Sequence, residues 1–172
     1  TYQNGANTFG DMVRRYLANG QEDRSFDPPD AHLFSPSAVW VDSDNTIVFA
    51  GRGDGPWGPI LMRLKADGAL DESFVYTAPE ALWSGNTMTR LADGSYITTT
   101  FGILPVAQPR RLNRFFADGG HDAEFDSGAG PDAQYWQDFW VRSLADGDFL
   151  MFGAFLTAGG EVVPKVARIS PK

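Results

Sequence analysis

The sequence predicts an all-β protein made of tandem copies of one small antiparallel sheet. Two phrases alternate along its 172 residues. Copies of the first read RRYLANGQEDRSF at 14–26, MRLKADGALDESF at 62–74 and NRFFADGGHDAEF at 113–125. Copies of the second read WVDSDNTIVFAG at 40–51, TRLADGSYITTT at 89–100 and VRSLADGDFLMFG at 141–153. Self-similarity at this period indicates one supersecondary unit copied in tandem.

In-phase residues fix the register of the repeat. Successive arginines stand 48, 51 and 54 residues apart: Arg15, Arg63, Arg114 and Arg168. Three aspartates keep the same phase: Asp23, Asp71 and Asp122. The copies therefore start near 15, 63, 114 and 168, the last one cut short, and residues 1–172 form a single repeat array.

Each unit should contain about four short strands. In the second phrase, Asp-Asn or Asp-Gly separates two apolar or β-branched runs, which is a strong hairpin signal because such turns need positive φ. Segments 47–50, 96–100 and 149–152 are apolar or β-branched on both faces, as in strands covered on both sides. No stretch of a dozen residues has the spacing of an amphipathic helix. We therefore expect stacked sheets and almost no helix.

A unit of about 51 residues with about four antiparallel strands matches one blade of a β-propeller. The phrases ADGALDESF at 66–74 and LADGDFLMFGAFLTAGGEVVPKVARI at 144–169 resemble the delta-60 repeat, a bacterial propeller-type repeat. The resemblance covers essentially the whole chain. It implies tandem blades of a large secreted or surface protein, and it implies no general activity.

Three periods are too few to close a ring, since closed propellers carry about four to eight blades. We therefore expect an incomplete ring within one chain. It is either a segment of a longer repeat protein or half of a six-bladed ring completed by a second copy. Further repeats or a homo-oligomer would cover the open ends of the array, which are otherwise an aggregation hazard.

Composition narrows the class of protein. The net charge of −8 disfavours binding to a phosphate backbone, so we expect no nucleic-acid partner. No apolar run is long enough for a membrane span. The absence of cysteine excludes disulfides, thiolate zinc sites and cysteine nucleophiles. With the resemblance, these features favour an extracellular or cell-surface location in a bacterium.

The four in-phase arginines admit two interpretations. They could ring a channel and bind an anion, because the guanidinium fork suits carboxylates and phosphates. We favour a structural role in which they pair with the in-phase aspartates, because function belongs to sites rather than to repeated scaffolding. Paired arginines should be mostly buried, whereas a binding ring should face a cavity.

Metal binding and catalysis have little support. Aspartates could supply the six to eight oxygens of a calcium site, yet no EF-hand or nonapeptide repeat is present. The best local candidate lies within 121–132, with Asp126 and Asp132 as ligands. His32 and His121 lie far apart, and no nucleophile motif accompanies them. The sequence predicts no catalytic residue, no enzyme and no cofactor, with calcium as the open alternative.

Aromatic residues that break the repeat are the candidate ligand-binding residues. They lie in loops: Trp57, Trp83, Trp136 and the neighbouring Tyr135. Exposed aromatic rings beside polar residues can stack on sugars or anchor a protein partner, and loops carry function in such scaffolds. Packing between blades is the competing interpretation for each tryptophan. Trp40 and Trp140, which are flanked by strand residues, should lie in the core.

Three functions remain open. The first is a non-catalytic binding or structural propeller segment of an exported bacterial protein, which presents loops to a glycan or protein partner. The second is a carbohydrate-active propeller enzyme, which needs two channel carboxyl groups roughly 5 to 10 Å apart and a raised pKa on one of them. The third is a self-assembly module, which predicts apolar surface on the first and last blades.

Overall fold

The computed structural model describes residues 13–29, 35–52, 61–77, 82–102, 111–125, 139–155, 157–158, 161–162 and 165–170. Every regular element in these ranges is a strand. The strands are β1 (Ser35–Val41), β2 (Ile47–Arg52), β3 (Leu61–Leu64), β4 (Leu82–Arg90), β5 (Tyr96–Gly102), β6 (Arg111–Phe115), β7 (Phe139–Ser143), β8 (Phe149–Gly153), β9 (Thr157–Ala158), β10 (Glu161–Val162) and β11 (Val166–Ile169). The described part contains no helix long and apolar enough to span a bilayer.

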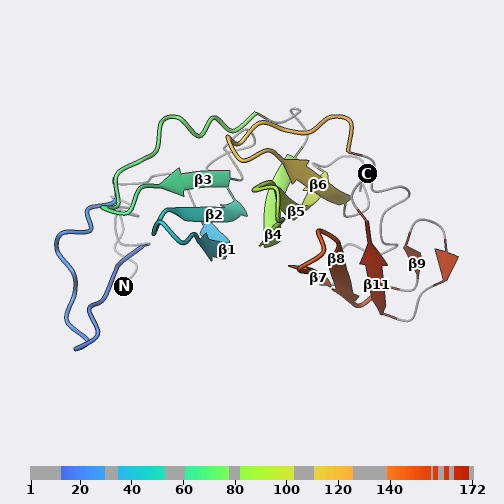
Figure 1. Cartoon of the computed structure of the whole chain (residues 1–172), viewed down its shortest axis with the longest axis horizontal. Helices are drawn as coiled ribbons and strands as arrows, with labels where there is room; N and C mark the ends of the chain where they lie inside the picture. The colour runs from blue at the N-terminus through green and yellow to red at the C-terminus, as the bar shows by residue number, and fades with distance from the viewer. Residues whose placement is uncertain are drawn as a thin grey trace, which may run out of the picture.

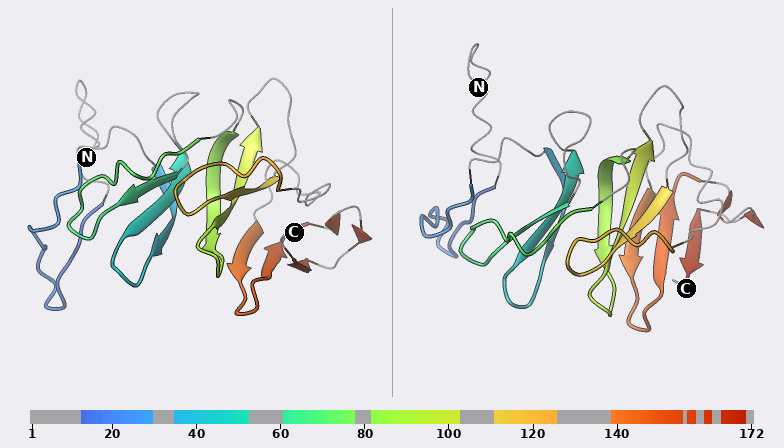
Figure 2. Two further views of the ribbon diagram at one scale, coloured as in Figure 1. Left: turned by 45° about the horizontal axis from the view of Figure 1, so that its top comes forward. Right: turned by 90° about the horizontal axis from the view of Figure 1, so that it is seen from above.

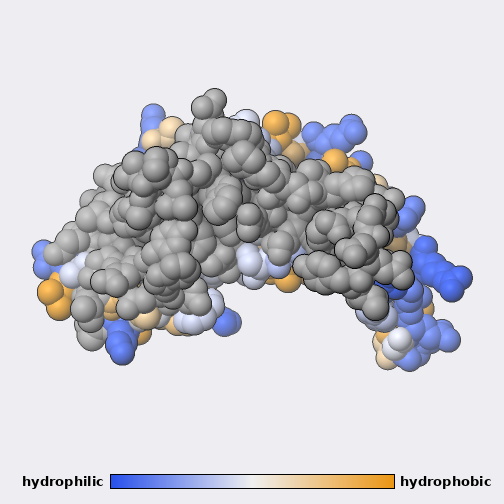
Figure 3. Space-filling model, turned by 180° about the vertical axis from the view of Figure 1, so that it is seen from behind, coloured by the Kyte–Doolittle hydropathy of each residue, from blue (hydrophilic) through white to orange (hydrophobic). Residues whose placement is uncertain are grey.

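Three antiparallel sheets of three strands form the body of the molecule. The first sheet has the order β1–β2–β3, the second β4–β5–β6 and the third β7–β8–β11, while β9 and β10 form a separate pair. The sheets follow an arc (Figure 1) and stand side by side (Figure 2). Strands β1, β4 and β7 are neighbours along the inner side of this arc. The space-filling view has an arched outline (Figure 3).

The three hairpins predicted from the second phrase are present. They join β1 to β2, β4 to β5 and β7 to β8. The residue after each turn aspartate has positive φ: 65° at Asn45, 87° at Gly94 and 91° at Gly147. Each turn aspartate accepts a backbone N–H two residues on, for example Asp44 from Thr46 at 3.0 Å. These residues set the backbone geometry of the bends.

Among the described residues, the first phrase of each copy returns only at an isolated bridge, so sheets of four strands are not confirmed. After β3, the chain turns through a hydrogen bond of 2.8 Å from the Lys65 N–H to the Ala69 carbonyl oxygen. It returns along β3 only at the bridge between Leu64 and Leu70. A second turn begins at Asp71 and leads the chain away, which leaves no room for a longer ladder.

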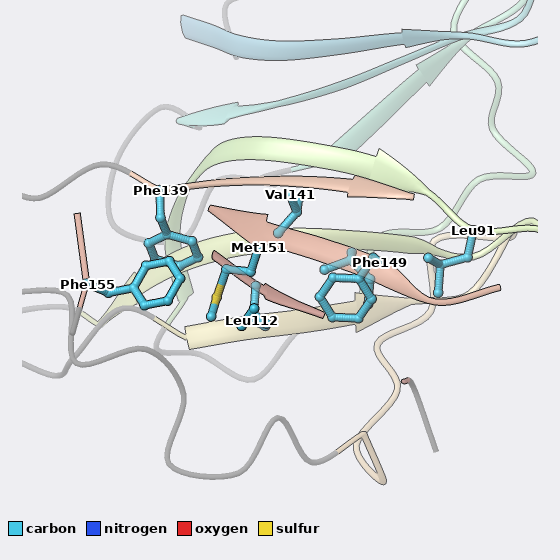
Figure 4. Packing of buried hydrophobic residues seen from close by; sticks show 9 residues of the cluster. Leu91, Leu112, Phe139, Val141, Phe149, Met151 and Phe155 are labelled. Carbon is cyan, nitrogen blue, oxygen red and sulfur yellow. The ribbon is translucent and has the colours of Figure 1, made fainter. Parts of the chain in front are cut away.

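Hydrophobic side chains fill the spaces between neighbouring sheets. Between the second and third sheets, Leu112 packs in one cluster with Phe149 and Met151 (Figure 4). A second cluster joins β2 and β3 of the first sheet to Tyr96 and Phe115 of the second. Two of the repeated phenylalanines belong to these layers, Phe74 and, partly buried, Phe125, whereas Phe26 packs on Phe49 and Met62 of the first sheet alone. Sheet-on-sheet burial of apolar area therefore holds the arc together.

Candidate functional site

Arg63 on β3 joins the first sheet to the second. Its Nε donates to Oδ2 of Asp71 at 2.7 Å, and its Nη1 donates to the carbonyl oxygen of Ala117 at 2.9 Å. Ala117 belongs to the turn after β6, so one guanidinium binds its own copy and the next copy together. The Arg63 Cζ lies 4.9 Å from the ring centroid of Phe74. Only 20% of the arginine side chain is exposed, which strengthens these charged hydrogen bonds.

Arg15 has the same contacts one copy earlier. Its Nε donates to Oδ2 of Asp23 at 2.8 Å, and its Nη1 donates to the carbonyl oxygen of Ala66 at 2.5 Å. Its Cζ lies 4.8 Å from the ring centroid of Phe26. We call this set of contacts the arginine clamp: an arginine, its aspartate and phenylalanine, and the turn carbonyl of the following copy.

Arg114 on β6 has no contact to a turn carbonyl of the next copy among the described residues. Its Nη1 is 3.6 Å from Oδ2 of Asp122, and the guanidinium instead binds Asp93 and, at 3.1 Å, the Oγ of Ser95. Both partners belong to the β4–β5 hairpin of its own sheet. The residue in phase with Ala66 and Ala117 is residue 171, which lies outside the described residues.

Arg168 on β11 lies on an exposed surface. Its Nη2 donates to Asp146 and its Nε to Asp148, each at 2.6 Å, and 56% of its side chain is exposed. Exposed pairs of this kind contribute little to stability. The four in-phase arginines thus occupy two environments, a clamp between copies for Arg15 and Arg63 and a hairpin of the same sheet for Arg114 and Arg168.

The glycine of the turn after β3 lies beside the chain that crosses over from the preceding copy. Gly68 has a φ of +97°, and a Cβ added there would come within 2.8 Å of the backbone nitrogen of Asp27. The same N–H of Asp27 donates to the carbonyl oxygen of Asp67 at 3.0 Å. Glycine meets both requirements, because it tolerates positive φ and leaves room for the crossing chain.

Gly119 repeats this close approach, and Gly20 does not. A Cβ on Gly119 would lie 3.0 Å from ring carbon Cε1 of Phe74 and 3.0 Å from the carbonyl carbon of Val75. The N–H of Val75 donates to the carbonyl oxygen of Asp118 at 2.8 Å. Gly20 has a similar φ of +83°, yet no atom lies within 4 Å of its Cβ position. The Gly20 turn therefore has the form of a docking site without a crossing chain among the described residues.

Two of the in-phase aspartates, Asp23 and Asp71, are held in their charged form. Hydrogen bonds from the hydroxyl and N–H of Ser25 lower the pKa of Asp23. The hydroxyl of Ser73 has the same effect on the pKa of Asp71, and Arg63 adds to it. All aspartates with a shifted pKa in the described part shift downward: Asp23, Asp44, Asp71, Asp93 and Asp148. Such carboxylates accept hydrogen bonds and do not act as general acids near neutral pH.

A polar cluster that the sequence did not predict links the first two sheets. Oδ1 of Asp42 accepts a hydrogen bond of 3.0 Å from Nε1 of Trp40, and Asp42 also pairs with Arg90 from β4. The Tyr96 hydroxyl lies 3.5 Å from its other oxygen, and burial with the Asp42 charge raises the tyrosine pKa. The position of Asp42 is leucine in the other two copies, which is a sequence signal for an unusual residue. Trp40, Arg90 and Tyr96 already surround the Asp42 carboxylate, so Asp42 serves as a link between the two sheets.

His121 lies in the turn after β6. Its Nε2 is 3.2 Å from Oδ1 of Asn113, and its ring meets Phe115 edge-on at 5.2 Å. Burial lowers the imidazole pKa, which favours the neutral ring at neutral pH. No nucleophile is paired with it in the contacts of the described residues.

Most sequence-predicted ligand and metal residues lie outside the described residues: Trp57, Tyr135, Trp136, Asp126 and Asp132, together with His32. Trp83 is part of β4, but its side chain also lies outside the described part. Within the ranges that the structure does describe, no group of three His, Asp or Glu side chains could hold a metal ion.

The core assignment of Trp140 is wrong. Its side chain on β7 is 49% exposed and stacks on Phe152 of β8, with ring centroids 6.0 Å apart and planes at 24°. Trp40 is half-buried and bonds to Asp42. Trp140 is exposed because it lies on the side of the third sheet that no other described sheet covers. The alternation of a strand shows which residues share a face, but it does not show whether that face is covered.

Residues 43–74 match the model of a family described as a domain of unknown function (DUF5122) beta-propeller. In this stretch the repeat is similar to a β-propeller repeat. The matched stretch runs from the β1–β2 hairpin through β3 to Phe74, so it includes Arg63 and Asp71 of the arginine clamp. A comparison with curated proteins finds no match.

Proposed function

We propose that this chain is a non-catalytic structural and binding segment of a β-propeller of the delta-60 type, from an exported bacterial protein. Its repeated polar residues hold successive blades together through hydrogen bonds, and its variable loops bind a protein or a glycan. The structural part of this proposal rests on one observation: Arg63 donates both to Asp71 and to the Ala117 carbonyl oxygen of the next copy.

The contacts of the clamp favour architecture over anion binding. The guanidinium groups of Arg15 and Arg63 already hold an aspartate and a carbonyl, so little of their donor capacity is left for an anion. The lowered pKa values of Asp23 and Asp71 give the carbohydrate-active alternative no support, because that reaction needs one carboxyl with a raised pKa.

Titration with inorganic phosphate tests the architectural role. We expect the unfolding temperature of the chain to be the same with and without phosphate at matched ionic strength, and we expect Arg63→Gln to lower it in both buffers. An anion ring would behave in the opposite way, with phosphate stabilising the parent chain and Arg63→Gln abolishing that effect.

The binding half of the proposal rests on the loop aromatics Trp57, Trp83, Trp136 and Tyr135. A glycan array probed with the full chain, and then with Trp57→Ala and Trp136→Ala, tests it. Binding that falls at least tenfold in either variant, with the unfolding temperature unchanged, supports loop recognition. Titration with calcium before and after Asp126→Asn and Asp132→Asn tests the accompanying metal site.

A further inference from the structure

Asn19 and Gly20 lie at the tip of an exposed turn in the first copy. Two backbone hydrogen bonds of 2.8 Å close this turn, from the Leu17 N–H to the Gln21 carbonyl oxygen and from the Gly20 N–H to the Leu17 carbonyl oxygen. All four of these residues are exposed. Exposed turns of this kind open locally at a low cost in free energy, so the peptide bond between Asn19 and Gly20 is open to chemical change.

The sequence Asn-Gly brings two groups together that react with each other. The peptide nitrogen of the glycine and the side-chain Cγ of the asparagine close a five-membered ring, and glycine has no side chain that hinders the approach. Asparagine is one of the thermolabile residues of proteins. Among the described residues, Asn19 is the one asparagine that glycine follows.

The in-phase turns of the next two copies carry the acid in place of the amide. Oδ1 of Asn19 accepts the Gln21 N–H at 3.0 Å. Oδ1 of Asp67 and Oδ1 of Asp118 each accept the N–H two residues further on, also at 3.0 Å. A carboxylate at position 19 therefore preserves the side-chain hydrogen bond that holds the turn.

The surroundings of the glycine distinguish the first turn from the other two. Gly68 and Gly119 are buried, with backbone atoms of the crossing chain 2.8 Å and 3.0 Å from their Cβ positions. Gly20 is exposed, and no described atom lies within 4 Å of its Cβ position. Packing restrains the peptide nitrogens of Gly68 and Gly119, whereas release of the bond to Leu17 frees the nitrogen of Gly20 among the described contacts.

We propose that Asn19 is a site of spontaneous deamidation in the folded chain. Hydroxide takes the proton of the Gly20 N–H, and the nitrogen forms a bond to Cγ of Asn19. The Cγ–Nδ2 bond breaks, Nδ2 takes a proton from water, and ammonia leaves behind a succinimide ring. Water then opens the ring at Cγ to give aspartate, or at the backbone carbonyl carbon to give isoaspartate. This inference goes beyond the proposed function and does not depend on any partner of the chain.

The two products affect the turn differently. Aspartate leaves the backbone unchanged and matches the in-phase residues Asp67 and Asp118. Isoaspartate routes the backbone through Cγ and lengthens it by one carbon atom. That product shifts the hydrogen bond between Leu17 and Gln21, and with it the bridge between Tyr16 and Glu22.

Peptide mapping of the full chain, sampled during incubation in mildly alkaline buffer, tests the proposal. Trypsin cleaves after Arg15 and Arg24, so residues 16–24 form one peptide that contains Asn19 and no other asparagine. Mass spectrometry after incubation in water labelled with heavy oxygen should show this peptide with one heavy oxygen, in an aspartate form and an isoaspartate form. The reference is a synthetic peptide of residues 16–24 in the same buffer. We expect the folded chain to convert at no less than about one tenth of the rate of the free peptide.

Two variants serve as controls. Asn19→Asp, which has the sequence of the first product, should unfold at the same temperature as the parent chain. Asn19→Gln should incorporate heavy oxygen in this peptide at least about tenfold more slowly, because its side chain would have to close a six-membered ring. A folded chain that converts at less than one tenth of the peptide rate would overturn the proposal, because the turn would then protect Asn19. Incorporation that Asn19→Gln does not slow would also overturn it, because the label would then come from another residue.

Discussion

The backbone nitrogen of Asp27 lies 2.8 Å from the position that a Cβ on Gly68 would occupy. The two residues belong to consecutive copies, and the N–H of Asp27 also bonds to the neighbouring Asp67 carbonyl at 3.0 Å. The turn of one copy and the crossing chain of the copy before it therefore fit together as one unit, which makes the glycine a residue of the interface as well as of the turn.

Gly68→Ala should destabilise the chain more than Gly20→Ala does. Both alanines adopt an unfavourable positive φ, which costs about 1–2 kcal/mol. Gly68→Ala also pushes the crossing chain away and should cost about 1–3 kcal/mol more. Urea denaturation of the two variants measures the difference. Equal losses of unfolding free energy in the two variants would mean that the Asp27 backbone does not restrict the side chain at position 68.

Thr99→Val should stabilise the chain by about 1 kcal/mol, because the buried Thr99 hydroxyl has no hydrogen-bond partner among the described residues and valine keeps its shape. The control is its neighbour Thr98, whose hydroxyl donates to the Thr87 carbonyl at 2.8 Å. Thr98→Val should cost about 1–2 kcal/mol. Thermal and urea unfolding of both variants check the opposite signs, and a destabilised Thr99→Val would show that the hydroxyl is satisfied.

Acid should destabilise the chain through Asp23 and Asp71. Their pKa values in the folded state lie below the ordinary 3.8, so the unfolded state binds more protons as the pH falls through 4. Their contribution is complete above about pH 5 and declines below pH 4. Unfolding free energies measured from pH 2 to 7 should follow this course.

Ser73→Ala separates this effect from general acid unfolding. The variant removes the hydrogen bond that contributes most to the low pKa of Asp71. The loss of stability between pH 5 and 3 should become shallower than in the parent chain. An unchanged slope would show that Asp71 is not responsible.

The in-phase residues predicted the hairpins well because the backbone conformation of each bend tolerates few residue types. Asp44 with Asn45, and Asp93 with Gly94, form bends whose positive φ few other residues tolerate, and the three hairpins are where the phrases place them. The fourth strand is different. The two phrases, each interpreted as strand, turn and strand, predict four strands per unit, yet a single bridge at Leu70 precedes the turn at Asp71.

Other features depend on what lies opposite a side chain, which one strand cannot reveal. The neighbours of Trp140 in the sequence predict a core residue, yet half of its side chain is exposed because no other described sheet covers its face of the third sheet. The ion pair between Asp42 and Arg90 joins two sheets. The two residues are 48 positions apart in the sequence, and neither is repeated in the other copies. The predicted loop residues Trp57 and Trp136 lie outside the described part and stay predictions.

The unfolding free energies of Arg63→Gln and Arg168→Gln show most directly whether the repeated arginines fasten one sheet to the next. Arg63→Gln should lose about 2 kcal/mol, because it gives up the bonds to Asp71 and Ala117 in a mostly buried site. Arg168→Gln, on an exposed surface, should leave the unfolding free energy close to that of the parent chain. A loss at Arg168 as large as at Arg63, or none at Arg63, would contradict a structural clamp between copies.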